Sequence, residues 1–289
     1  GTLDELNATA TTVCLDWDGT GWVMGPTNNP ASLVRYVLEG KANARRIPVA
    51  RIDLLGLQGW HGRCVAGGRT YNAVRDFSST VYETLRDICT IGRASPTMRD
   101  GQFSVVEDLL QANASQIFSP RNSWGFKSTK TLTTRPHALR CRFVNAEKGY
   151  QQDVRIVYDD GYNADGTGGL TAATLIEDFD LPGCDNAGLA YRHGRYNIAV
   201  NKLRPELFSL SSDFENLTCT RGDKVEVVHD VPMLAMGQAR IKSVTMNGSD
   251  EVTGVTLDDS LLMVNGQTYG LRIRRRDGQQ VLVGLVTVA

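Results

Sequence analysis

The chain has 289 residues, of which 41% are hydrophobic and 22% charged, and its formal net charge is −1. This length is enough for two or three modest cores, and the charge balance lacks the excess of Lys and Arg that nucleic acid or an anionic membrane requires. No apolar run approaches the roughly 18 residues of a membrane span, and no basic-then-apolar signal segment opens the chain. Because Gly1-Thr2-Leu3-Asp4 contains no Met, we expect the chain to begin inside a longer protein.

Residues 1–112 are predicted to form a mixed α/β domain, of which 1–29 are loop-rich. Asn29 can cap a helix whose first position is Pro30, and Gly40 can end that helix. Asp100-Gly101 favours a tight hairpin turn. Further helices are expected at 53–65 and 80–89, a strand at 70–77, and the two strands of the hairpin at 95–99 and 102–106.

Residues 113–220 are predicted to form an antiparallel β domain with one long helix. Apolar residues alternate along two of its strands, as in a half-buried antiparallel sheet. Asp185 is expected to cap the helix, which runs to about residue 203, and 161–169 is a Gly- and Asp-rich loop. The strands are expected at 117–118, 124–131, 138–145, 153–158 and 207–214.

Residues 221–289 are predicted to be nearly all β. Five short strands in about 65 residues suggest a small barrel or sandwich. The expected strands are 224–228, 238–244, 251–257, 268–275 and 281–288, with turns at Asn247-Gly248, Asn265-Gly266 and Asp277-Gly278. The complete chain is thus expected to be a multidomain α+β protein with a small C-terminal β-barrel.

Six cysteines are scattered along the chain, and none lies within four residues of another. This spacing provides no Cys-x-x-Cys clip for zinc or redox chemistry. We expect core thiols of a reducing compartment rather than disulfides. The cysteines are Cys14, Cys64, Cys89, Cys141, Cys184 and Cys219.

The most specific catalytic pattern is Asp16-Trp17-Asp18-Gly19-Thr20, which matches the Asp-x-Asp-Gly-Thr signature of haloacid-dehalogenase-type phosphatases. In that signature the first Asp is the nucleophile, the second is the acid/base, and magnesium bridges carboxylate and phosphate. The chemistry needs a buried parallel strand before the motif, and only residues 13–15 are apolar here. A turn with solvated carboxylates is the favoured interpretation, with a phosphatase using Asp16 and Asp18 as the alternative.

Four other patterns are weaker. Arg221-Gly222-Asp223 spells an integrin-binding tripeptide but is an ordinary entry to a strand. Asp159-Asp160 resembles a metal-binding turn without a partner carboxylate motif upstream. The histidines, at 61, 137, 193 and 229, are too dispersed for metal-ligand spacing. A basic cluster, Arg272, Arg274, Arg275 and Arg276, could bind an anion or an acidic neighbour, although a solvated strand face is the favoured interpretation.

Three ordered groups of short motifs carry a family resemblance. The first begins at Asn29-Pro30-Ala31-Ser32-Leu33 and continues through 75–77 to 100–106. The second begins at Pro120-Arg121-Asn122-Ser123-Trp124-Gly125-Phe126 and continues through 142–145 to 155–162. The third begins at Phe179-Asp180-Leu181-Pro182-Gly183 and continues through 192–195, 204–206 and 219–223 to 229–232.

In this order the motifs resemble the central hub region of the tail tip attachment (host-specificity) proteins of long-tailed phages and prophages, over roughly residues 2 to 245. The resemblance implies a trimeric hub in the full-length protein, with mixed α/β and β-barrel domains like those of contractile-tail baseplate hubs. It implies other tail proteins as partners, a place at the virion tail tip after synthesis in the bacterial cytoplasm, and no catalytic residue. A receptor-binding part would lie beyond these residues.

The sequence analysis therefore predicts a virion structural protein that is not an enzyme and has no catalytic, cofactor-binding or metal-binding residues and no cofactor. Two alternatives stay open. One is a receptor- or glycan-binding module of the tail tip, and the other is the Mg-dependent phosphatase.

Overall fold

The structure is a computed structural model, and it describes residues 8–130, 135–229, 239–249, 251–260, 263–274 and 280–287. The chain divides into two compact units. Unit 1 comprises Gly1–Asp108 and Lys130–Glu206, and unit 2 comprises Leu109–Thr129 and Leu207–Ala289. The expected segment 113–220 contributes to both units, and its expected boundaries at residues 112 and 220 stay a prediction.

Unit 1 opens with an antiparallel hairpin of β1 (Val13–Trp17) and β2 (Trp22–Pro26), which the sequence analysis placed in a loop-rich region. The strands are joined by a turn in which the N–H of Asp18 donates to the carbonyl of Gly21 over 3.1 Å. The rings of Trp17 and Trp22, partners in the register, lie 5.7 Å apart and reinforce the hairpin.

Three helices follow close to their expected ranges, and the expected cap of the first is confirmed. Helix α1 (Pro30–Glu39) begins after Asn29, whose side chain accepts from the N–H of Ala31. Helix α2 (Leu54–Ala66) begins after Asp53 in the same way. Helix α3 (Val81–Ile91) has a reciprocal capping box between Thr80 and Glu83. A short 3-10 turn, η1 (Val49–Arg51), precedes α2.

The hairpin of β3 (Ala94–Arg99) and β4 (Gln102–Glu107) is also confirmed. Its turn residues Asp100 and Gly101 both have positive φ, 51° and 76°, as the tight turn requires. The strand expected at 70–77 is wrong, because these residues form no ladder. Instead, the N–H of Tyr71 donates to Asn28 and that of Asn72 to Gly183, so two separate segments anchor this stretch.

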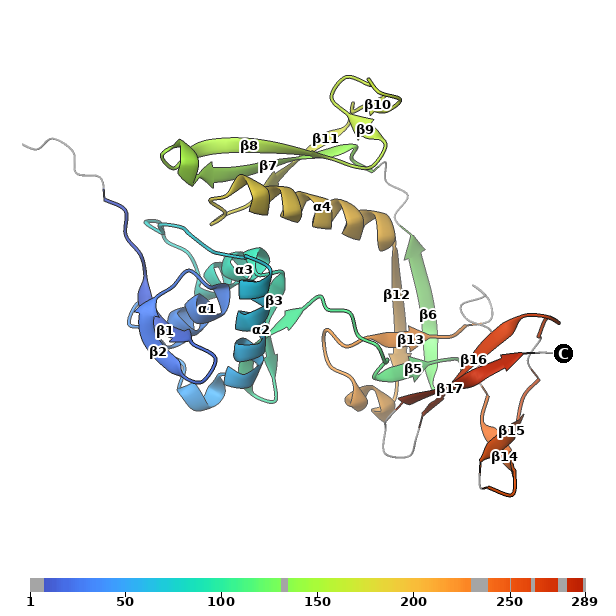
Figure 1. Cartoon of the computed structure of the whole chain (residues 1–289). Helices are drawn as coiled ribbons and strands as arrows, with labels where there is room; N and C mark the ends of the chain where they lie inside the picture. The colour runs from blue at the N-terminus through green and yellow to red at the C-terminus, as the bar shows by residue number, and fades with distance from the viewer. Residues whose placement is uncertain are drawn as a thin grey trace, which may run out of the picture. The chain divides into compact units, whose positions relative to one another are not determined.

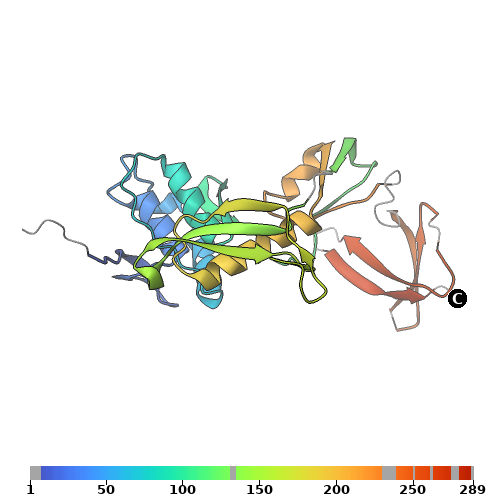
Figure 2. The same cartoon turned by 90° about the horizontal axis from the view of Figure 1, so that it is seen from above.

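The second part of unit 1 is a three-stranded sheet in the order β11-β7-β8 with helix α4 on one face (Figure 1). Strands β7 (Ala138–Asn145) and β8 (Gln151–Tyr158) are antiparallel, but β11 (Ile176–Asp180) runs parallel to β7, so this sheet is mixed rather than antiparallel. No ribbon lies over the opposite face of the sheet in the view from above (Figure 2). The connections contain η2 (Ala146–Lys148) and the short strands β9 (Tyr162–Asn163) and β10 (Thr171–Ala172).

Helix α4 (Ala187–Leu203) packs closely on this sheet through Gly194. A Cβ atom at Gly194 would lie 2.7 Å from Val157 and 2.9 Å from the Sγ of Cys141, so only glycine fits without a shift. The N-cap of α4 is Asn186, not the expected Asp185. The Asp185 carboxylate instead accepts from the side-chain amide of Asn72 over 2.8 Å.

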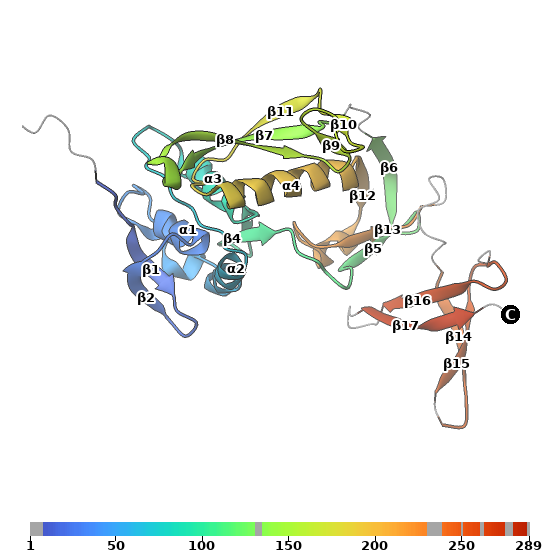
Figure 3. The same ribbon diagram turned by 45° about the horizontal axis from the view of Figure 1, so that its top comes forward.

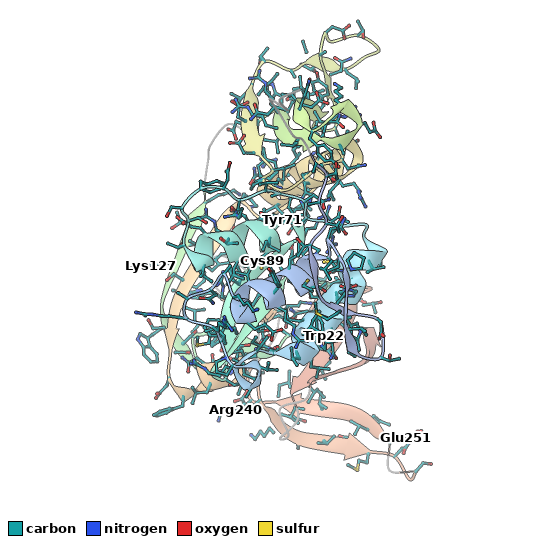
Figure 4. All side chains as sticks on the ribbon, turned by 90° about the vertical axis from the view of Figure 1, so that its left-hand side faces the viewer. Trp22, Tyr71, Cys89, Lys127, Arg240 and Glu251 are labelled. Carbon is teal, nitrogen blue, oxygen red and sulfur yellow. The ribbon has the colours of Figure 1, made fainter. Side chains whose placement is uncertain are left out.

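The apolar core of the described residues lies in unit 1. Trp60 and Leu57 of α2 are fully buried, and Cys89 and Tyr71, labelled in Figure 4, belong to the same cluster. All six cysteines are free thiols, as expected, and five are buried. Burial raises the pKa of the Cys64 thiol to about 12, so this thiol stays protonated and packs as a small apolar side chain.

Unit 2 consists of two-stranded sheets (Figure 3). Strand β5 (Gln116–Phe118) pairs in parallel with β13 (Val225–Val227), and β6 (Ser123–Lys130) pairs with β12 (Glu206–Ser212). Strands β14 (Ile241–Met246) and β15 (Val252–Leu257) form one antiparallel hairpin, and β16 (Thr268–Arg274) and β17 (Gln280–Thr287) pair in the same way. A 3-10 turn, η3 (Phe214–Thr218), follows β12.

The expected C-terminal strands are therefore present, but the expected barrel is not formed by the residues described. The two C-terminal pairs, β14-β15 and β16-β17, are separate two-stranded sheets, and a barrel would require ladders that join them. The turn expected at Asp277-Gly278 lies outside the described residues.

Candidate functional site

A buried polar cluster surrounds Asp16, the first aspartate of the phosphatase-like motif. Its Oδ1 accepts hydrogen bonds from the Ser32 hydroxyl at 2.6 Å and the Thr27 hydroxyl at 2.8 Å, and His61 Nε2 lies 3.0 Å away. Asn29 fixes the backbone of the same region by donating to the carbonyl of His61 over 3.2 Å. The cluster ties the β1-β2 hairpin to helices α1 and α2.

The electrostatics of this cluster favour an ionised Asp16. Burial alone raises the pKa of this carboxyl, but the hydrogen bonds from Ser32, Thr27 and His61 outweigh burial and hold the pKa below its ordinary value of 3.8. Ser32 donates to the carboxylate and not to His61, so its hydroxyl has no base to activate it as a nucleophile. The arrangement therefore suits a structural clamp between three elements.

Asp18, the second aspartate of the motif, stabilises the turn in which it lies. Its Oδ1 accepts from the N–H and hydroxyl of Thr20, both at 2.8 Å, and from the N–H of Gly21 at 2.7 Å. These bonds hold the pKa of Asp18 below 3.8. Within the ranges that the structure describes, strand β1 pairs only with antiparallel β2, and these residues do not form the buried parallel strand that phosphatase chemistry needs.

The acidic pair Asp159-Asp160 lies against the positively charged side of α4. Lys202 Nζ is 3.3 Å from Asp159 Oδ1, and Arg195 Nη2 is 2.7 Å from Asp160 Oδ1. Arg195 also donates to the carbonyl of Tyr158 over 2.8 Å, which fixes the end of β8 on the helix. These carboxylates are ion-paired and stabilise the packing of α4 on the sheet.

The tripeptide Arg221-Gly222-Asp223 forms a turn before β13. The Asp223 carboxylate accepts from the N–H of Thr220 over 2.7 Å, and the carbonyl of Gly222 accepts from Gln111 over 2.8 Å. Gly222 has φ +98°, which explains the glycine at this position. The structure thus gives the tripeptide a local role in the turn.

The four histidines are in separate environments. Beyond the contact of His61 with Asp16, His137 stacks on Tyr162 with ring centres 4.2 Å apart, and His229 stacks on Phe126 at 4.5 Å. His193 is buried on α4, and burial, with the charges of nearby arginines, lowers its pKa to about 4. In the ranges that the structure describes, no three His, Cys, Asp or Glu side chains are grouped so that they could hold a metal ion.

The C-terminal basic cluster is only partly described. Arg272 and Arg274 lie on β16, which pairs with β17, and Arg275 and Arg276 lie outside the described residues. The expectation that this strand binds an anion or an acidic neighbour stays a prediction.

Unit 2 exposes large apolar side chains to an extent that the sequence analysis missed. Trp124 of β6 is 60% exposed and Leu207 of β12 is 71% exposed. Phe214 and Leu217 of η3, which follows β12, are 79% and 77% exposed. The buried side chains of the described part of unit 2 are few, namely Ala114, Gln116, Phe118 and Ser119. Exposed apolar surface of this kind marks an interaction site.

A second open surface is the face of the β11-β7-β8 sheet opposite α4. Arg140 and Arg142 of β7 pair with Asp178 of β11, and Arg142 also lies 3.7 Å from Asp180. Beside these ion pairs, β8 exposes Val154 and Ile156. Exposed ion pairs contribute little to stability, so this face is a better candidate for contacts with another molecule than for holding the fold.

Comparisons with known proteins find a distant likeness among solved structures. No protein-family model matches the sequence, and no curated protein matches it. Among solved structures, a similar chain is the tail protein from Neisseria meningitidis MC58, with 14% sequence identity and a TM-score of 0.39. The match covers 54% of this chain and 47% of that chain, so this chain spans about half the length of that neighbour. At this score the likeness carries no assignment of fold or role.

The sequence contained a partial signal for the missed surface. Trp124, Leu207 and Phe214 fall within strands that the analysis predicted, but alternation along a strand does not tell which face finds a partner. Every helix in the described part of the chain is too short or too polar to cross a membrane. The candidate functional site is therefore the exposed apolar surface of unit 2, and the Asp16 cluster is a structural clamp.

Proposed function

We propose that the chain is a structural component of a phage or prophage tail tip, part of the hub of the tail-tip complex in a host-specificity protein. The observation that carries this proposal is the apolar surface of unit 2. Strand β12 exposes Leu207, and the η3 turn after it exposes Phe214 and Leu217, while this part of unit 2 buries few side chains of its own. Such segments gain stability by packing against another chain. A protein built in this way acts by assembly.

The ordered motifs over roughly residues 2 to 245 indicate the kind of assembly that we propose. Their resemblance to tip attachment proteins supports a trimeric hub in the full-length protein, with domains like those of baseplate hubs. The partners are then further copies of the chain and other tail proteins, with any host receptor bound through parts outside these residues. The location is the virion tail tip, after synthesis in the host cytoplasm, and no catalysis is assigned.

Mass spectrometry of purified phage particles tests the proposal. We expect peptides of this chain in the particles at a low, fixed ratio to the tail-tube protein. A double variant, Leu207→Ser with Phe214→Ser, is expected to fold in unit 1 but to enter particles at least about tenfold less. Leu55→Ser is the matched control, because Leu55 is 79% exposed but lies on α2 of unit 1. Particles that lack the chain, or equal loss in both variants, would contradict the proposal.

The two alternatives have direct tests. Magnesium-dependent phosphatase activity that disappears in Asp16→Asn would establish the enzyme instead of the structural role. Glycan-array binding by residues 1–289 would favour the receptor- or glycan-binding module. We expect neither result. For the phosphatase test, the reason is that Asp16 Oδ1 and Asp18 Oδ1 accept hydrogen bonds from neighbouring donors of the fold.

A further inference from the structure

Three arginines meet in unit 1 where helices α2 and α3 end against α4. Arg69 follows the C-cap of α2, Arg93 follows the C-cap of α3, and Arg192 lies on α4. Their charges act on one another: burial and then the positive charges of Arg69 and Arg192 lower the pKa of Arg93. The same three guanidinium groups act together on the buried imidazole of His193.

Backbone carbonyls hold these guanidinium groups in place. Arg69 Nη1 donates to the carbonyl of Gly92 over 3.1 Å, and Arg93 Nη2 donates to the carbonyl of Arg192 over 2.9 Å. Arg192 donates to the carbonyls of Gly67 and Gly68, the latter over 3.2 Å. The arginines thereby cap two helix C-termini, a structural role that uses only part of their donor capacity, since each guanidinium has five N–H groups.

The carboxylates of this region are already paired with other arginines. Asp108 accepts from Arg204 over 2.8 Å and from the Tyr196 hydroxyl over 2.7 Å. Glu107 accepts from Arg63. Among the residues that the structure describes, no acidic side chain forms an ion pair with Arg69, Arg93 or Arg192. Asp108 also acts on the charge of Arg93 without forming an ion pair with it. One carboxylate that is already bonded to Arg204 does not balance the three charges, so an external anion would stabilise them.

Arg93 is the least satisfied member of the group. Its Nε is buried and has no hydrogen-bond partner among the described residues, while its guanidinium lies 4.6 Å from the centre of the Tyr196 ring. Its backbone has φ +56°, a left-handed conformation that is unfavourable for a non-glycine residue. The surrounding structure thus holds Arg93 in an unfavourable conformation next to two other positive charges.

We propose that Arg69, Arg93 and Arg192 form an oxyanion-binding site whose ligand is a carboxylate on an acidic segment of a partner protein. Guanidinium groups bind carboxylate oxygens through charge-assisted hydrogen bonds. A protein carboxylate fits this site better than nucleic acid, because proteins hold an extended phosphate backbone through many Lys and Arg side chains and this site offers three. The assignment to a partner protein rests on the proposed function, in which the chain works by assembly.

Binding of a fluorescent hexaglutamate peptide to the purified chain at low salt tests the site. We expect saturable binding that Arg192→Gln and Arg69→Gln each weaken by about tenfold or more. The matched control is the double variant Arg45→Gln with Arg46→Gln, because this exposed pair lies elsewhere on unit 1, and it should change the affinity by less than about twofold. Equal weakening in the control, or no binding by the wild type, would overturn the proposal.

Inorganic phosphate tests whether the site binds oxyanions in general or carboxylates of a protein in particular. We expect phosphate to compete with the peptide, and to raise the melting temperature of the wild type but not of Arg192→Gln. Phosphate binding without peptide binding would overturn the assignment to a protein carboxylate. Arg93→Lys keeps the charge but loses the planar fork, so a folded Arg93→Lys chain with unchanged affinity would also contradict the site. These measurements use the purified chain. A negative result therefore contradicts the oxyanion site, whereas absence of the chain from phage particles contradicts the proposed function.

Discussion

Asp16 matches a catalytic motif in the sequence, but in the structure it holds three elements together through hydrogen bonds. The sequence identified Asp16 and Asp18 through their motif, but the donors to Asp16 lie 11, 16 and 45 residues away. Local sequence cannot place such partners, because only the packing of the hairpin on α1 and α2 brings them together. By contrast, the contacts of Asp18 are all within three residues, and the favoured interpretation of a turn is confirmed for it.

Replacing Asp16 by Asn tests the clamp. Charge-assisted hydrogen bonds are about twice as strong as neutral ones, so we expect Asp16→Asn to lower the free energy of unfolding by about 1–3 kcal/mol at pH 7. Because the pKa of folded Asp16 lies below 3.8, its contribution is complete above that pH and is lost as the pH falls through the folded pKa. Urea unfolding at pH 7 and at pH 3 measures the change.

Asp18→Asn is the control for this prediction. Asp18 is exposed, unlike Asp16, so water screens its charge and solvates it in the unfolded and folded chain alike. Because Asn keeps an Oδ1 acceptor in the turn, the unfolding midpoint should stay close to that of the wild type. If Asp16→Asn were as stable as Asp18→Asn at pH 7, the clamp would have no energetic role. A difference between Asp16→Asn and the wild type that did not shrink at low pH would rule out the carboxylate as its source.

At the level of elements, the starts of the first three helices and the β3-β4 hairpin were predicted well, but strand partners distant in sequence were not. Asn29, Asp53 and Thr80 cap their helices because a cap is satisfied by N–H groups two or three residues away. The strand expected at 70–77 failed because its N–H groups bond to segments distant in sequence. The parallel pairing of β11 with β7 was missed for the same reason, since their register joins residues 38 positions apart.

The contact of α4 with its sheet gives a prediction at this level. Alanine in place of glycine inside a helix usually stabilises by about 0.5–1 kcal/mol. At Gly194 the new Cβ would lie 2.7 Å from Val157, so Gly194→Ala must push the helix from the sheet and we expect a net loss of about 1–3 kcal/mol. Chemical denaturation followed by circular dichroism measures it.

Gly62→Ala in α2 is the matched control, because no atom lies within 4 Å of the Cβ position there. It should stabilise the protein, so the two glycine substitutions are expected to have opposite signs. Stabilisation by both would show that α4 does not depend on a close approach to β7 and β8.

At the level of the whole molecule, both units expose large apolar side chains, but the buried apolar cluster of the described residues lies in unit 1 alone. Composition suggested two or three modest cores, yet the buried cluster of the described residues lies in unit 1. The alternation of apolar and polar residues predicted the strands of the C-terminal part correctly. The same alternation arises whether the apolar face of a strand packs within its own chain or against another chain. This ambiguity explains why a barrel was expected and separate hairpins were found.

Hydrogen exchange followed by mass spectrometry tests this division. Backbone amides exchange through local opening, whose free energy follows the buried contacts of each element. In the isolated chain we therefore expect peptides of α2 and β7 to exchange at least about tenfold more slowly than peptides of β6, β12, β14 and β15. Isolated two-stranded ribbons are marginally stable in water, whereas α2 and β7 contain fully buried residues such as Trp60 and Cys141.

The same measurement on assembled particles completes the argument. If unit 2 is stabilised by packing against other chains, β6 and β12 should gain protection in the particle, while α2 and β7, already buried, should change little. Equal protection of β6 and β7 in the isolated chain would mean that unit 2 holds itself together without a partner. Because the comparison is made peptide by peptide within one chain, unit 1 serves as the internal reference for the state of unit 2.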